Sequence, residues 1–269
     1  LFGVLLFIIL GILIPKTEGF VGTYIQSGEW TMAGGLNLLF AALIQVFSYP
    51  FHDPVLTDRA FIAPPKTTLK SFVWATLIGG LCILLFSFVG IYARLTDLED
   101  QAAVEVAKTL GVFMMLIMNF IMVTSAASTL DSAFASFAKL SVIDLGKEIN
   151  ASVAKGRLAM VIIATAGTVP IFFGPEILSA TTVSGTMVIG LAPVFLFWNK
   201  PFPPVSFHLS IGAGVLFGLI LALGLYPEQF VLFEGKYGDL LSINIIGTVV
   251  CFILFFVPKA VEKWLNVKI

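Results

Sequence analysis

The residues best suited to bind a ligand or take part in chemistry form a run of small hydroxyl side chains around one carboxylate, inside a long apolar stretch. Residues 124–136 read Thr-Ser-Ala-Ala-Ser-Thr-Leu-Asp-Ser-Ala-Phe-Ala-Ser. At about 100° per residue the polar members share one broad helix face, namely Thr124, Ser125, Ser128, Asp131, Ser132 and Ser136, with Thr129 at its edge. Hydroxyl and free carbonyl oxygens are ligands that hard cations prefer, so this face could bind a monovalent ion.

A second interpretation of the same face is a seam where helices pack together. Small residues allow close helix approach, and Ser and Thr hydroxyls can bond to their own backbone. Asp131 argues against a pure seam, because a carboxylate near the membrane centre costs about 3 kcal/mol. We expect it to face water, an ion or a basic partner. Asp131 is therefore a candidate for an ion path.

A second polar cluster lies at the end of an apolar block that covers residues 32–51. Projected as a helix, one face carries Gln45, Ser48, Tyr49, His52 and Asp53. Prolines at positions 50 and 54 each remove a backbone donor and disturb the preceding turn. Broken helices in transporters expose carbonyls and helix ends to a solute. The five residues are therefore candidate substrate contacts, while a solvated helix end remains the alternative for the last two.

The remaining polar groups of the apolar stretches are better explained by helix packing than by ligand binding. A third hydroxyl run consists of Ser179, Thr181, Thr182, Ser184 and Thr186, but its members are spread around the helix. Both cysteines sit in apolar stretches, where packing is the simpler interpretation. The sequence has no spacing typical of a zinc site and no phosphate- or dinucleotide-binding glycine pattern. We expect no cofactor and no nucleic-acid partner.

The composition shows which elements must position these groups. Of 269 residues, 58% are hydrophobic and 12% are charged, and the mean hydropathy is +1.03. Soluble domains have about 25% charged residues. The apolar residues come in continuous blocks, whereas a membrane barrel would need shorter alternating segments. We therefore predict an all-α membrane protein in a lipid bilayer.

About eight transmembrane helices are expected from the apolar blocks. The blocks are residues 1–14, 32–51, 71–93, 110–140, 158–173, 176–198, 205–226 and 240–257. Fourteen helical residues reach only about 21 Å, less than the 30 Å or so of the hydrocarbon core. We therefore expect the first block to be the end of a truncated helix, with further N-terminal helices of the same protein upstream.

The basic residues predict the topology. Alternate connectors hold eleven Lys and Arg, and the remaining connectors hold four, which together account for all fifteen. The richer set should be cytoplasmic by the positive-inside rule. A multi-pass protein with both ends of this chain in the cytoplasm is expected.

Two segments resemble the sodium:solute symporters, which include proline, sugar and iodide transporters. The sequence 128–132, Ser-Thr-Leu-Asp-Ser, matches the core of that family's sodium-site helix, and Asp144-Leu145 stands where the family ends this helix. Residues 51–61, Phe-His-Asp-Pro-Val-Leu-Thr-Asp-Arg-Ala-Phe, are similar to the Phe-Gly-Gln-Pro…Arg-Phe run of proline-type members. Gly146 replaces a family Tyr, and His-Asp replaces Gly-Gln.

The resemblance implies a leucine-transporter-like fold. Residues 1–269 would form a single transmembrane domain, with 31–198 as the second five-helix inverted repeat and 199–269 as two additional helices. Sodium would be the metal ion bound, by the Ser128 and Thr129 hydroxyls and the Ser125 carbonyl. The solute would contact the broken helix.

The function implied is secondary active transport, a symport of sodium with a small organic solute by alternating access. Three alternatives stay open. A proton could replace sodium, through His52 or Asp131. Symporter-like domains can also serve as membrane sensors. An intramembrane enzyme would need a nucleophile–base pair, but no hydrolase or metalloprotease motif supports one, so enzymatic activity is not expected.

Overall fold

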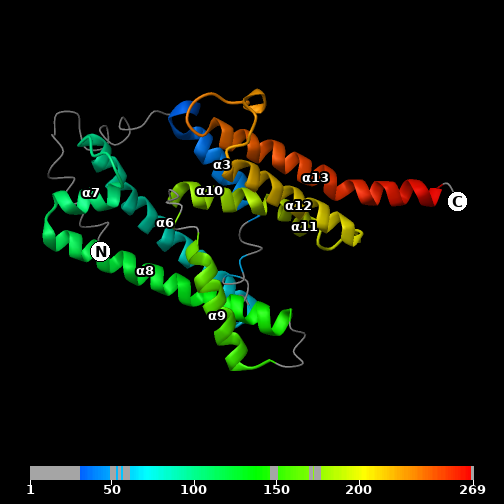
Figure 1. The fold of residues 1–269 in the computed structure, drawn as a ribbon, viewed down its shortest axis with the longest axis horizontal. Helices are drawn as coiled ribbons and strands as arrows, with labels where there is room; N and C mark the ends of the chain where they lie inside the picture. The colour runs from blue at the N-terminus through cyan, green and yellow to red at the C-terminus, as the bar shows by residue number, and fades with distance from the viewer. Residues whose placement is uncertain are drawn as a thin grey trace. The chain divides into compact units, whose positions relative to one another are not determined.

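The computed structural model describes residues 31–48, 53, 56, 61–145, 151–169, 172 and 177–267 (Figure 1). Within these ranges every regular element is helical. The chain forms two compact units, each described by itself below. Unit 1 comprises Leu1–Gly28 and Asp58–Ala166, and unit 2 comprises Glu29–Thr57 and Gly167–Ile269.

Four helical segments of the described chain are long and apolar enough to cross a membrane. They are Pro65–Leu95, Val112–Asp144, Pro204–Ala222 and Gly238–Trp264, with 31, 33, 19 and 27 residues. Two shorter apolar segments are Met32–Val46 and Ala180–Leu196. The helical class predicted from the sequence is thus confirmed, and the four long apolar helices indicate a membrane protein. The count of eight spans and the inverted-repeat fold stay predictions.

The described part of unit 1 contains two long helices joined by a short one, with a further helix after them. Helix α6 (Pro65–Leu95) begins with proline, whose fixed φ suits a first helical position. It is followed by α7 (Ala102–Thr109), α8 (Val112–Lys139) with a π-helical end η2 (Leu140–Asp144), and α9 (Val153–Thr168). The short α7 buries Val106 and Ala107 in a cluster with Val89 and Ala93 of α6 and Met118 of α8. This cluster fixes the end of α8 nearest α7.

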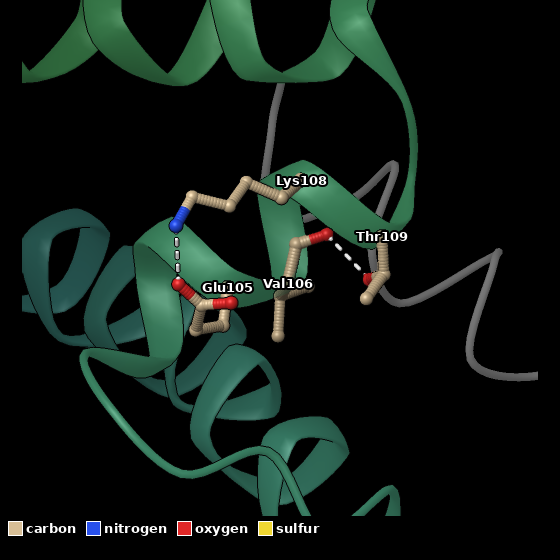
Figure 2. Close-up of polar contacts among 4 residues, drawn as sticks. All are labelled: Glu105, Val106, Lys108 and Thr109. Carbon is tan, nitrogen blue, oxygen red and sulfur yellow. Dashed lines mark hydrogen bonds and ion pairs between the residues drawn. The ribbon is translucent and has the colours of Figure 1, made fainter.

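The exposed side of α7 carries the local polar contacts drawn in Figure 2. Lys108 Nζ lies 2.6 Å from Glu105 Oε1 one turn earlier, and the hydrogen bond and charge of that carboxylate raise the pKa of Lys108. The Thr109 hydroxyl donates to the Val106 carbonyl at 2.8 Å, where α7 ends. Exposed pairs of this kind add little stability, so the buried cluster holds α7 in place.

Unit 2 begins with an irregular helix. A π-helical turn, η1 (Met32–Leu36), leads into α3 (Asn37–Val46). Gly35 interrupts η1 with a φ of +146°, which a residue with a side chain rarely adopts. The expected block 32–51 is thus kinked at its start. Its predicted break at the prolines of positions 50 and 54 lies outside the described residues.

Among its described residues, the rest of unit 2 contains one interrupted helix and two long ones. The interrupted helix consists of α10 (Ile177–Met187), a 3₁₀ segment η4 (Val188–Leu191) and α11 (Ala192–Leu196). Helices α12 (Pro204–Ala222) and α13 (Gly238–Val267) follow, with a 3₁₀ turn η5 (Glu228–Phe230) between them. They lie side by side in Figure 1 and pack against each other.

Small residues allow the backbones of η4 and α12 to touch. The buried face of α12 consists of Ser206, Ser210, Ala213, Gly214 and Gly218. The Ser210 hydroxyl donates to the Gly190 carbonyl at 2.6 Å. A Cβ atom added at Gly214 would lie 2.7 Å from the Met187 carbonyl oxygen and 2.8 Å from the Gly190 nitrogen. Glycine is therefore required at position 214 by this close approach.

An aromatic contact ties the α11–α12 connector to the far part of α13. The Phe202 and Phe255 ring centroids lie 4.4 Å apart. Lys259 Nζ lies 4.2 Å from the Phe202 ring centroid and donates to the Pro201 carbonyl at 2.7 Å. Cation–π contacts of this geometry contribute about 0.5–2 kcal/mol. The contact therefore helps to hold α13 against the connector.

Candidate functional site

The predicted sodium ligands lie in the second half of α8, in unit 1. The Thr129 hydroxyl donates to the Ser125 carbonyl at 3.1 Å, so two of the three predicted ligand oxygens are adjacent. Ser128 is one residue earlier in the same turn. All three side chains are exposed, although they belong to a segment long enough to span a membrane.

Back-bonding recurs along this face. The Thr124 hydroxyl donates to the Phe120 carbonyl at 2.7 Å, and the Ser132 hydroxyl donates to the Ser128 carbonyl at 3.3 Å. These bonds satisfy hydroxyl protons while leaving oxygen lone pairs on the outer surface of the helix. The face can therefore present neutral oxygens to a cation without losing its helical bonds.

Asp131 lies on the same exposed face, one turn after Ser128. A carboxylate that faced hydrocarbon there would cost several kcal/mol. The exposure of Asp131, together with the hydroxyls beside it, indicates a surface that has to face water, an ion or a polar partner in the membrane.

The predicted solute-binding residues that the structure describes belong to unit 2. Ser48 is buried, and its hydroxyl donates to the Gln45 carbonyl at 3.1 Å. Asp53 is half-buried. Tyr49 and His52 lie outside the described residues. The proposed common face of all five can thus be followed only in part.

The side-chain amide of Gln45 reaches from α3 to two neighbouring helices, α10 and α13. Its Nε2 atom lies 3.0 Å from the Thr182 carbonyl, 3.2 Å from Thr186 Oγ1 and 3.3 Å from Asn244 Oδ1. Asn244 Nδ2 donates to Thr186 Oγ1 at 3.2 Å and to the Leu240 carbonyl at 2.8 Å. We call Gln45, Thr186 and Asn244 the amide cluster.

The donors of the amide cluster are saturated. Two protons on Gln45 Nε2 face three acceptors, and the two on Asn244 Nδ2 have one acceptor each. The Gln45 side-chain oxygen lies directly over Gly185, so a Cβ atom at that position would force the Gln45 amide to shift. In this conformation Gln45 offers a solute no donor, so a direct contact would use its amide oxygen.

Sequence reasoning missed two members of the amide cluster. The sequence predicts only a packing role for Thr186 and indicates no role for Asn244. A usable signal existed for Asn244, because an amide in an apolar span is costly and therefore marks a polar partner. For Thr186 no such signal existed, since its run of hydroxyls surrounds the helix.

Replacing Thr186 with valine is expected to destabilise the protein by about 1 kcal/mol. The change keeps the shape but removes the hydroxyl shared by Gln45 and Asn244. The melting temperature in detergent should fall by about 2–4 °C. Ser184→Ala is the control, because the Ser184 side chain is exposed and its hydroxyl bonds only to its own helix. Equal melting temperatures for the two variants would show that the amide cluster does not contribute to the stability of the protein.

The described helices indicate a helical membrane protein with polar groups on helices that are long and apolar enough to cross a membrane. The comparisons with known proteins add no family to this class, because no family model, no curated protein and no solved structure matches the chain.

Proposed function

We propose that this chain belongs to a secondary transporter that couples the entry of sodium to the uptake of a small organic solute. The observation that carries the proposal is the exposed oxygen-rich face of α8, inside a 33-residue apolar segment. Its Ser125 carbonyl and Thr129 hydroxyl are already adjacent. Neutral oxygens suit a monovalent cation, which binds weakly enough to be released again.

Interrupted helices support the transport part of the proposal. Helix breaks at membrane depth free backbone groups for ions and solutes, and π-helical turns often occur at functional sites. Such an irregularity begins the helix proposed to bind the solute, in the kinked π-helical turn η1. The solute would bind near the broken helix that begins with α3, close to Gln45 and Ser48. In this proposal the full protein has the leucine-transporter-like repeat, and access alternates as helix bundles rock.

A proton-coupled transporter is the second candidate, and Asp131 favours it. An exposed carboxylate in an apolar span can carry a proton as readily as it can attract sodium. The two candidates differ in the ion that stabilises the protein and drives uptake.

Sodium should stabilise the protein, and choline should not. A ligand that binds only the folded state at a hundred times its dissociation constant adds about 2.7 kcal/mol. We expect the protein expressed from its complete coding sequence to melt several degrees higher in sodium chloride than in choline chloride. In liposomes it should exchange radioactive sodium and take up members of a panel of labelled amino acids and sugars down a sodium gradient.

Uptake that persists in choline and follows a pH gradient would show that protons, and not sodium ions, drive the transport. A sensor or an enzyme would give neither uptake nor counter-flow of any labelled solute in the panel.

A further inference from the structure

An apolar groove in unit 2 takes no part in the proposed transport chemistry. It has a volume of about 620 Å³ and lies between α3, the η4–α11 segment and α13. Among the described residues that line it, Thr248 contributes the single polar side chain, and its hydroxyl proton is already donated to the Asn244 carbonyl at 2.7 Å. The groove therefore offers an occupant almost entirely apolar contacts, which suit a hydrocarbon.

The groove follows α13 for about the depth of one membrane leaflet. Leu241, Ile245, Thr248 and Phe252 lie on successive turns and line it. Eleven residues of helix span about 16 Å, and half of the hydrocarbon core is about 15 Å. One end reaches Phe233 in the connector between α12 and α13. Because both helices have spanning length, this connector lies at the membrane surface.

The length and lining of the groove suit a flexible apolar chain. An extended hydrocarbon chain can follow the roughly 16 Å of α13 that lines the groove, whose volume is about 620 Å³. A helix from this or another chain is the competing occupant, and crosslinking distinguishes the two.

Opposite charges mark the surface end of the groove. Glu234 and Lys236 are exposed and follow Phe233 directly. The Asn37 side chain of α3 fixes their backbone, since its Nδ2 donates to the Glu234 carbonyl at 3.0 Å and to the Lys236 carbonyl at 3.3 Å. The Lys236 ammonium lies 5.1 Å from the Tyr237 ring centroid. One anion and one cation in the connector next to Phe233 are complementary to a headgroup that carries an ammonium and a phosphate.

We propose that the groove binds one acyl chain of a zwitterionic phospholipid with an ethanolamine headgroup. The phosphate contacts Lys236 and the ammonium contacts Glu234. The chain lies along α13 between Phe233 and Phe252. This lipid fills the groove beside α3 and α13, which also pack directly on each other through Ala41, Leu240 and Leu241.

Filling the groove should expel the lipid. Thr248→Phe places a ring in the groove, while Val249→Phe places the same ring at the next position, which is 53% exposed and does not line the groove. Native mass spectrometry of protein reconstituted with phosphatidylethanolamine and then returned to mild detergent should show one retained lipid per wild-type chain. The control should retain it equally, and retention should fall at least tenfold in Thr248→Phe.

A second measurement on the wild-type protein keeps the proposal testable if Thr248→Phe fails to fold. Phosphatidylethanolamine with a photoreactive acyl chain should label peptides of α3 and the first half of α13 in preference to the exposed face of α12. Lys236→Gln should weaken retention several-fold. Equal retention by both phenylalanine variants, unselective labelling, or a crosslinked second copy of this chain at α13 would each overturn the proposal.

Discussion

Half-maximal sodium-driven uptake is expected to need about tenfold more sodium after Ser128→Ala or Thr129→Ala. Each change removes one of the three oxygens proposed to hold the ion, and a loss of about 1.4 kcal/mol corresponds to a factor of ten. Thr129→Ala also frees the Ser125 carbonyl from its 3.1 Å hydrogen bond. Sodium-dependent thermal stabilisation should shrink in parallel, so that binding can be measured without knowing the solute.

Two further variants separate a sodium ligand from a packing residue. Thr129→Ser keeps the hydroxyl and should keep the sodium affinity within a few-fold. Ser87→Ala in α6 removes a hydroxyl that donates only to the Leu84 carbonyl of its own helix, and should leave the affinity unchanged. If neither alanine variant on α8 changes the sodium affinity, the assignment of this site is wrong.

Gly214→Ala is expected to destabilise the protein far more than Gly212→Ala on the same helix. At position 214 a Cβ atom would lie within 3 Å of backbone atoms of Met187 and Gly190. Those atoms cannot rotate away, so the helices must separate, and overpacking of this kind costs about 1–3 kcal/mol. The melting temperature in detergent should fall by roughly 5 °C or more for a chain of this size.

Position 212 provides the matched control for this effect. No atom lies within 4 Å of a Cβ added there, and alanine is about 1 kcal/mol better than glycine inside a helix. Gly212→Ala should therefore melt at the wild-type temperature or slightly above it. A Gly214→Ala protein as stable as this control would mean that α12 and η4 do not meet as described.

The helices could be predicted from the sequence because their signal is local. The block 110–140 became α8 and the block 205–226 became α12, each with ends shifted by a few residues. The polar face around Ser128 also followed from helical spacing alone. Membrane helices are set by continuous apolar length, which a single sequence displays directly.

The contacts between helices could not be predicted in the same way. Gln45 bonds to residues 137–199 positions away, and helical spacing says nothing about which helix faces which. The break at η4 has a local signal in Pro193, which has no amide proton for the Ile189 carbonyl and whose ring crowds that carbonyl. The close approach of the α12 backbone to Gly190 has no such signal, because it depends on which helices meet.

The glycine contact between η4 and α12 also limits how this part of the chain can move. With backbone against backbone, neither lipid nor water can enter the gap, and sliding by even one residue would bring a side chain into it. The interrupted helix and α12 must therefore travel as one rigid body. Amide hydrogens near Gly190 should exchange as slowly as those of an unbroken helix, and any change of shape must pivot at joints elsewhere in the protein.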